Sequence, residues 1–276
     1  MLKATSISER CACALVGLSR DSWRHPPQRA QHDQATSQRI VELAHERRRF
    51  GYRRIGDLLR AAGTRINDKR VYRLYKLADL SVRKRRGKQR LKLERVPLHE
   101  CQTINEVWSM DFVSDSLASG RRIKCLTVTD DFSHECVDIA VDHGIGGEYV
   151  VRVLDQVARF RGYPQAVRTD QGPEFTSRAF MAWAQAKGVR HILNQPGKPT
   201  QNAYIESFNG KFRDECLNEH WFQSLKQARV EIARWRTDYN EVRPHSSCGR
   251  MPPAKFAAQH RQTTGGAVPA PLQTQE

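Results

Sequence analysis

The sequence predicts an α/β core with a five-stranded mixed sheet, preceded by a basic, all-α helix-turn-helix region. Two observations support this. Near residue 103 the hydrophobic pattern changes from helical spacing to short alternating runs separated by turn residues. The charge changes at the same place: residues 1–100 hold 25 Lys and Arg against 10 Asp and Glu, whereas residues 101–276 hold 21 against 20.

Charge and composition limit the possible classes of function. The net charge of +16 lies almost wholly in the first hundred residues, which favours nucleic-acid binding there over a merely solvated basic surface. No apolar run approaches membrane-spanning length, and no signal-peptide core follows Met1. The seven Cys lack the spacing of a disulfide framework or zinc site, so we interpret them as structural or incidental residues of a reducing compartment.

The N-terminal region is predicted to be helical in two parts. Residues 1–30 form a short segment of two helices separated by Gly17, and the polar stretch Gln28–Gln38 is predicted to be a linker. Residues 33–80 have the spacing of three helices, the last capped by Asn67. An ordinary three-helix bundle fits this periodicity as well as a helix-turn-helix does. The density of arginine favours the DNA-binding interpretation.

Basic side chains of this region are the expected DNA contacts, and a basic linker at residues 81–102 is expected to follow phosphate backbone. They are Arg53 and Arg54 on the second helix, Lys69, Arg70 and Arg73 on the third, and Arg83, Lys84, Arg85 and Arg86 in the linker.

The α/β core is assigned to residues 103–220. Three short strands come first, and helices then alternate with two further strands. The expected strands are 107–113, 123–129, 136–141, 166–169 and 189–193, with helices around 150–160, 177–187 and after 202, where Asn202 is a plausible N-cap. Residues 221–260 are expected to be a helical extension with an apolar stripe, and residues 261–276 a disordered tail.

Three carboxylates stand out within this core. Asp111 alternates with Trp108, Met110 and Phe112, so it lies on the opposite face of its strand, where an acid is costly unless paired or bound to metal. Asp170 ends a strand, and Glu206 lies beside the apolar stripe of a helix. A helix-dipole Glu and a turn Asp would explain the last two separately. Together, the three are an oxygen-ligand set for a hard divalent metal.

The motifs around these acids resemble a known family. Trp-Ser-Met-Asp-Phe at 108–112, Asp-Gln-Gly-Pro-Glu-Phe at 170–175 and Asn-Ala-Tyr-Ile-Glu-Ser-Phe-Asn-Gly-Lys at 202–211 resemble the signatures of insertion-sequence transposases. The similarity is to the second-reading-frame (OrfB) subunit of the IS-three group, which has a retroviral-integrase-like core. The 35 residues between the second Asp and the Glu match that family. Gln171, His134 and Cys248 depart from its usual residues.

The resemblance implies a ribonuclease H-like fold and a DNA transposase that cleaves element ends and transfers the 3′-OH into DNA. It implies that Asp111, Asp170 and Glu206 are catalytic and hold two Mg²⁺ or Mn²⁺ ions. Arg213 would contact phosphate near the scissile bond, Asn209 would orient substrate or Glu206, and Lys211 would contact DNA. Other acids of the core, namely Asp115, Asp130, Asp131 and Glu174, are interpreted as turn or solvent residues, with Glu174 the best candidate for indirect support.

The resemblance also implies partners and a location. Double-stranded DNA, both element ends and target, is the expected substrate. A homo-oligomer on DNA, an upstream-frame helix-turn-helix partner or fusion, and a bacterial cytoplasmic, nucleoid-associated location are expected, without a membrane. Two alternatives remain: a DNA-binding regulator with an inactive core, and a ribonuclease H-like nuclease without joining activity.

Overall fold

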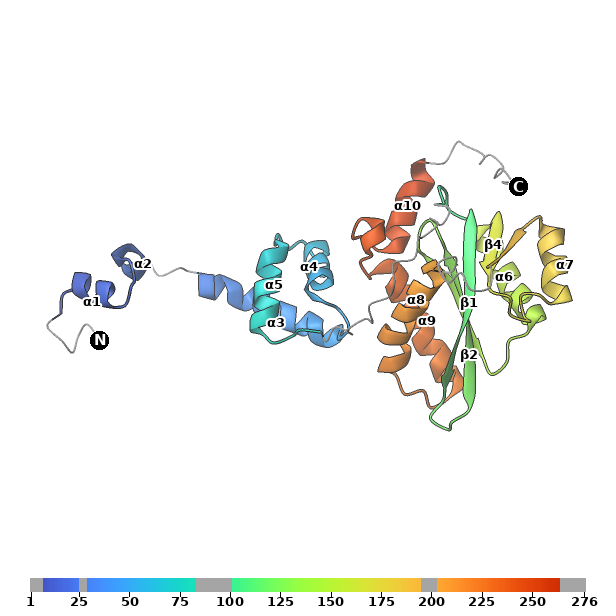
Figure 1. Ribbon diagram of the computed structural model, residues 1–276, viewed down its shortest axis with the longest axis horizontal. Coiled ribbons are helices and arrows are strands. Elements are labelled where there is room, and N and C mark those ends of the chain that lie inside the picture. Colours follow the sequence, from blue (N-terminus) through green and yellow to red (C-terminus); the bar gives the residue numbers. More distant parts are fainter. Residues whose placement is uncertain (1–6, 25–28, 83–100, 195–202, 264–276) are drawn as a thin grey trace, which may run out of the picture. The chain divides into compact units, whose positions relative to one another are not determined.

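The computed structural model describes residues 7–24, 29–82, 101–194 and 203–263 (Figure 1). The chain divides into two compact units, Met1–Arg86 and Gly87–Glu276. Predictions that fall on other residues, including the Asn202 cap and the linker side chains Arg83, Lys84, Arg85 and Arg86, lie outside the described residues.

The first unit begins with two short helices, α1 (Glu9–Leu15) and α2 (Arg20–Arg24). Ser8 caps α1, where its hydroxyl accepts from the Cys11 backbone N–H, and the Ser19 hydroxyl accepts from the Ser22 N–H at the start of α2. Gly17 separates the helices in the left-handed conformation, at φ +66°. The two predicted short helices are therefore present.

Three further helices share one apolar core: α3 (Arg29–Glu46), α4 (Tyr52–Ala61) and α5 (Asp68–Leu77). Ile40, Ile55 and Val71, one from each helix, are fully buried in it. The Asn67 side chain caps α5 as predicted. The prediction of a polar linker at Gln28–Gln38 is wrong, because α3 already begins at Arg29. The first half of α3 is polar, and the residues that pack into the core lie in its second half. Local helix propensity is a weak guide to where such a helix begins.

The second unit contains a five-stranded mixed sheet in the order β3-β2-β1-β4-β5. β1 pairs antiparallel with β2, and β2 with β3; β4 runs parallel to β1, and β5 to β4. The predicted five-stranded mixed sheet is therefore confirmed. The strands are β1 (Val107–Ser116), β2 (Arg122–Asp130), β3 (Cys136–Asp142), β4 (Ala166–Thr169) and β5 (Arg190–Leu193).

Helices cover both faces of the sheet (Figure 1). Those on one face are α6 (Gly147–Arg161) and α7 (Arg178–Lys187), and those on the other are α8 (Ala203–Glu215) and α9 (Leu225–Glu241). Trp108 and Met110 of β1 face the α6–α7 core, whereas Val113 faces the α8–α9 core. The alternation predicted for this strand is thus observed, and it sends Asp111 toward α8.

Some predictions about individual core residues are wrong. Phe160 lies in α6, the helix expected around residues 150–160, but it is 91% exposed, whereas Val150 and Leu154 of the same helix are buried. Residues 261–263, expected in the disordered tail, belong to α10 (Pro253–Thr263), and residues 264–276 lie outside the described residues. Asp130 and Asp131, interpreted as turn or solvent residues, are buried. Burial raises the pKa of Asp131 to about 6, although the Arg168 guanidinium lies 2.6 Å away. Long-range partners that sequence spacing does not reveal explain the burial of these acids.

A buried ion pair fastens the chain after α9 to the end of α8. Arg243, 2% exposed, donates from Nε and Nη2 to the two carboxylate oxygens of Glu215 at 2.6 and 2.7 Å. This bidentate geometry suits a guanidinium and a carboxylate. The pair holds the segment that follows Arg243, including His245, beside α8.

We predict that Glu215→Ala lowers the free energy of unfolding by about 3–5 kcal/mol, because it removes the bidentate partner of a buried charge. The measurement is urea unfolding of the full chain followed by tryptophan fluorescence. Glu42→Ala is the control, since Glu42 and its partner Arg39 are both exposed and such pairs contribute about 0–1 kcal/mol. Equal losses in the two variants would contradict the importance of the Arg243 pair.

Candidate active site and nucleic-acid interface

The Asp111 side chain occupies the middle of β1 and is held by α8. It lies half-buried on the face toward α8, and its cross-strand neighbour on β2 is Thr127. Oδ1 accepts from the Phe112 backbone N–H at 2.7 Å, and Oδ2 accepts from the Asn209 amide at 2.8 Å. The Thr127 hydroxyl lies 2.9 Å from the Asn209 Oδ1 atom. These contacts fix the amide of Asn209 with its nitrogen toward the carboxylate.

Asp170 directly follows β4, the parallel neighbour of β1. Its Oδ1 accepts from the Gly172 backbone N–H at 2.9 Å, which closes a tight turn. A Cβ atom at residue 172 would lie 3.0 Å from that oxygen, so the turn favours glycine. Asp170 is exposed at the C-terminal end of its strand, the position that was predicted.

Glu206 lies in the first turn of α8 and is exposed. Its neighbours Ile205 and Phe208 are buried in the α8–α9 core, as the predicted apolar stripe requires. Glu206, Asn209 and Arg213 form a second stripe on α8. Because the apolar stripe packs into the core, this second stripe faces β1.

The three acids influence one another electrostatically. Burial raises the pKa of Asp111, and the nearby charges of Asp170 and Glu206 raise it further. The hydrogen bonds from the Phe112 N–H and Asn209 oppose that shift. Desolvation therefore contributes more to the raised pKa of Asp111 than repulsion by the other two acids does.

The donor set fits a hard divalent cation in its chemistry, because all three residues offer carboxylate oxygens and a cation would relieve their repulsion. In the described part of the chain, however, no three His, Cys, Asp or Glu side chains stand together as a formed metal site. Asp111 and Asp170 are each hydrogen-bonded to nearby amides instead.

The other residues predicted around the site are distributed differently. Arg213 donates to the Ser114 carbonyl at 3.1 Å, near the far end of β1. Asn209 binds Asp111 rather than orienting Glu206. Lys211 points away from the carboxylates, to the opposite side of α8, where its Nζ lies 2.9 Å from the His245 Nε2 atom. Glu174 forms an ion pair with Lys124, so its charge is compensated.

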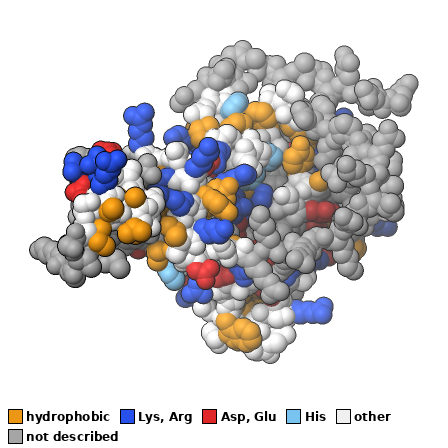
Figure 2. Space-filling view, turned by 60° about the vertical axis from the view of Figure 1, so that its left-hand side comes forward, with side chains coloured by type: hydrophobic (Ala, Val, Ile, Leu, Met, Phe, Trp, Pro, Cys, Tyr) orange, Lys and Arg blue, Asp and Glu red, His pale blue; other side chains and the backbone are white. Residues whose placement is uncertain are grey.

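In the first unit, two predicted DNA contacts on α5 share one acid. Arg70 and Arg73 both pair with Asp33 of α3, at 2.8 and 2.5 Å. Arg53 and Lys69 are exposed, whereas Arg54 is half-buried with its guanidinium over the Phe50 ring. Lys and Arg side chains are spread over the described surface in Figure 2, with fewer acidic ones between them. The face shown in this view is therefore rich in basic side chains.

Sequence reasoning missed two contributors to this region. Thr127 is a fully buried polar residue of β2, and such a residue signals a hydrogen-bond partner on the covering helix. His245 belongs to the Arg-Pro-His segment at 243–245, whose position beside α8 depends on the long-range Arg243 ion pair. No local pattern could place it.

Comparison with known proteins identifies the family. Models described as "Integrase core domain" match residues 102–199 and 187–253, and one described as "HTH-like domain" matches residues 31–89. A 39.2 kDa protein of insertion element IS476 from Xanthomonas euvesicatoria is 65% identical over 98% of this chain and 78% of that protein. A 31.7 kDa protein of insertion element IS407 from Burkholderia multivorans is 62% identical over 94% and 93%. The chain belongs to the IS-three group of insertion-sequence transposases.

Solved structures agree on the fold of this transposase. The chain resembles one from a simian T-cell lymphotropic virus intasome with a TM-score of 0.55 and 15% identity, over 86% of this chain and 80% of that one. The ribonuclease H-like fold class, with an HTH-like region before it, is therefore confirmed. The enzyme is a polynucleotidyl transferase of the DNA transposase class. Within the described residues, no helix is long and apolar enough to cross a membrane.

We predict that Asn209→Ala raises the pKa of Asp111 further, because it removes a hydrogen bond that favours the charged carboxylate. The measurement is a pH titration of the Asp111 carboxyl carbon by NMR. Asn218→Ala is the control, since Asn218 is exposed after α8 and contacts Asp214 instead. An unchanged or lower pKa in Asn209→Ala would contradict the described geometry.

We also predict that a fragment of residues 1–100 of the transposase retains most of the DNA affinity, with a steep salt dependence from phosphate contacts. Residues 101–276 carry almost no net charge and should bind weakly. Gel-shift titrations of both fragments over a salt series measure this. Equal affinities would show that net charge does not decide where the DNA binds.

Proposed function

We propose that Asp111, Asp170 and Glu206 form the catalytic centre of this transposase. The observation that carries the proposal is the half-buried Asp111 carboxylate, which lies within electrostatic range of the other two acids on a neighbouring strand end and the covering helix. A fold bears such a desolvation cost where the charge has a use.

Asp111, Asp170 and Glu206 would together hold two divalent ions, Mg²⁺ or Mn²⁺, through their carboxylate oxygens. When bound, such ions activate an attacking water or hydroxyl and stabilise the leaving oxygen of a phosphodiester. The fold family generally depends on divalent metal. The exposed positions of Asp170 and Glu206 leave their oxygens accessible to ligands and substrate.

The residues of the chain position the substrate for two successive reactions at one site. In the first, water attacks a phosphodiester at the element end and leaves a 3′-OH. In the second, that 3′-OH attacks a phosphodiester of the target and displaces its 3′ oxygen. Asn209 keeps the Asp111 carboxylate aimed toward α8 by its amide N–H. Arg213 follows Glu206 by two helical turns and is suited to hold a DNA phosphate beside it.

DNA capture is assigned to the helix-turn-helix-like region, residues 33–80, with residues 81–102 as the basic connection to the core at 103–220. Arg53, Lys69 and the arginines of α5 are the proposed phosphate contacts. The working form is proposed to be a homo-oligomer on double-stranded DNA. It would act with an upstream-frame helix-turn-helix partner, in the bacterial cytoplasm at the nucleoid.

We predict that Asp111→Asn and Glu206→Gln each lower the rates of end cleavage and strand joining by more than about a hundredfold. Loss of a residue that only supports a metal ligand lowers activity about 10- to 100-fold, and loss of the ligand itself should lower it more. The affinity for DNA should stay unchanged in both variants. The measurement is an assay of purified transposase with labelled end DNA and Mg²⁺ or Mn²⁺, beside gel shifts.

Asp115→Asn is the matched control, because Asp115 lies on the same strand and its Oδ1 accepts from the adjacent Ser116 N–H. Wild-type rates in Asp111→Asn or Glu206→Gln would rule out the assignment of the carboxylates. Cleavage without joining by the wild-type chain would favour a nuclease, and binding without either reaction would favour a regulator.

A further inference from the structure

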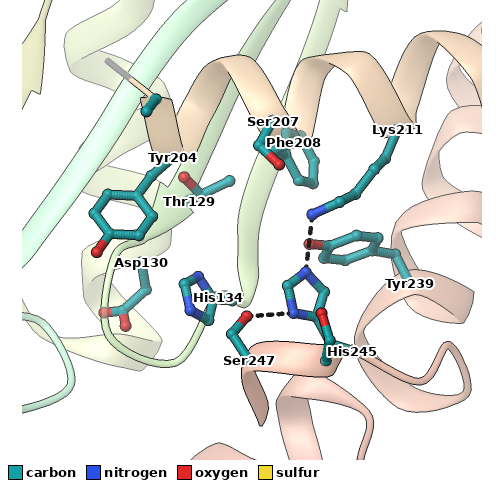
Figure 3. A pocket seen from close by; sticks show the side chains of 12 residues that line it. Thr129, Asp130, His134, Tyr204, Ser207, Phe208, Lys211, Tyr239, His245 and Ser247 are labelled. Atoms are coloured by element: carbon teal, nitrogen blue, oxygen red, sulfur yellow. Dashed lines mark hydrogen bonds between the residues drawn. The ribbon is translucent and has the colours of Figure 1, made fainter. Parts of the chain in front are cut away.

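A cavity of about 680 Å³ lies on the side of α8 opposite to the carboxylates. Tyr204, Ser207 and Lys211 line it at helical spacing, whereas the stripe of Glu206 and Asn209 faces the other way. Its remaining walls are the end of β2, the following turn with His134, and the segment after α9 with His245 (Figure 3). We call this cavity the Lys211 pocket.

A hydrogen-bonded chain crosses the Lys211 pocket. The Lys211 Nζ atom lies 2.9 Å from His245 Nε2, and His245 Nδ1 lies 2.7 Å from the Ser247 hydroxyl. An ammonium can only donate, so Nε2 accepts and the proton of a neutral His245 sits on Nδ1, which then donates to the Ser247 oxygen. The hydroxyl hydrogen of Ser247 is consequently directed elsewhere than to His245. Figure 3 shows this chain reaching from α8 to the 246–248 turn.

A second imidazole is held against the first. The His134 ring stacks on the His245 ring with 5.2 Å between centroids and 20° between planes. His134 has φ +56°, a left-handed conformation that is strained for a residue with a side chain and that is maintained at functional positions. Burial and the Lys211 charge lower the pKa of His134, against the opposite effect of Asp130, and its other aromatic neighbour is Tyr204. The lowered pKa favours the neutral form of this ring.

Asp130, the acid in the wall of the pocket, has its own hydrogen-bond and charge partners. Asp130 is 1% exposed, and its Oδ1 accepts from the Ser133 N–H and hydroxyl at 2.7 and 2.8 Å. Its Oδ2 accepts from the Asn105 N–H at 2.7 Å, and the Arg161 guanidinium lies 3.8 Å away. The charge of Asp130 is thus compensated inside the fold, and the Lys211 ammonium lines the cavity together with imidazole and hydroxyl groups.

We propose that the Lys211 pocket binds a backbone phosphate of the DNA substrate, at a point across α8 from the catalytic carboxylates. The inference rests on the proposed function, because it takes the DNA held at Glu206 to continue past this helix. Tyr204 and Ser207, which line the pocket, flank Glu206 in the sequence, so a strand at Glu206 passes the pocket within a few nucleotides. Lysine, serine and histidine donors around one cavity suit a tetrahedral oxyanion.

The test measures DNA affinity of the full chain by fluorescence anisotropy over a salt series, with Lys211→Met as the variant. Loss of one phosphate contact should weaken binding roughly threefold to tenfold and reduce the salt slope by about one. Lys226→Met is the matched control, since Lys226 is exposed near the start of α9, far along that helix from Tyr239 of the pocket, and it should change neither quantity. Lys211→Arg keeps the charge and should restore the slope.

A second arm titrates the full chain with inorganic phosphate and follows His134 and His245 by NMR. Phosphate should perturb both rings in the wild type but not in Lys211→Met. Perturbed rings with an unchanged DNA slope would identify a site for free phosphate compounds and overturn the DNA assignment. An unchanged slope with unperturbed rings would overturn the pocket altogether. Neither arm depends on catalysis, so an inactive wild-type chain would refute the proposed function without affecting this test.

Discussion

The proposed catalytic site of this transposase depends on holding a carboxylate, Asp111, half-buried in the middle of β1. Desolvation opposes its charge, and the hydrogen bonds from the Phe112 N–H and Asn209 compensate part of that cost. Because Asn209 is on α8 and is itself held by Thr127 of β2, the same network joins the helix to two strands. The packing of α8 on the sheet and the orientation of the Asp111 side chain therefore depend on the same hydrogen bonds. Because Glu206 is also on α8, its position depends on them as well.

The helix α8 carries three different stripes at once. Ile205, Phe208 and Phe212 pack into the core and fix the rotation of the helix. That rotation sends the Glu206 stripe toward β1 and the Lys211 stripe toward the cavity with the two imidazoles. The Arg243–Glu215 ion pair completes the second side, since it brings the segment with His245 beside α8. A DNA substrate that followed both sides of α8, as proposed, would be held by a rigid element rather than by loops.

The helix-turn-helix-like unit organises its charge differently. Asp33 of α3 accepts from two arginines of α5, Arg70 and Arg73. Guanidinium groups have several donors in a fixed fork, so an arginine held by one carboxylate keeps a defined direction for its remaining N–H groups. The acid thereby orders side chains that would otherwise be free to rotate on an exposed helix.

Local pattern was sufficient for much of this protein. The alternation around Asp111, the strand before Asp170 and the apolar stripe beside Glu206 each follow from residue spacing, because the periods of strands and helices dictate which side chains share a face. Only the tertiary structure decided the features that depend on distant partners. These are the burial of Asp130 and Asp131, the hydrogen bond from Asn209 to Asp111, and the contact between Lys211 and His245. Those contacts join residues far apart in the chain, and their energy comes from desolvation and pairing that exist only once the fold has closed around them.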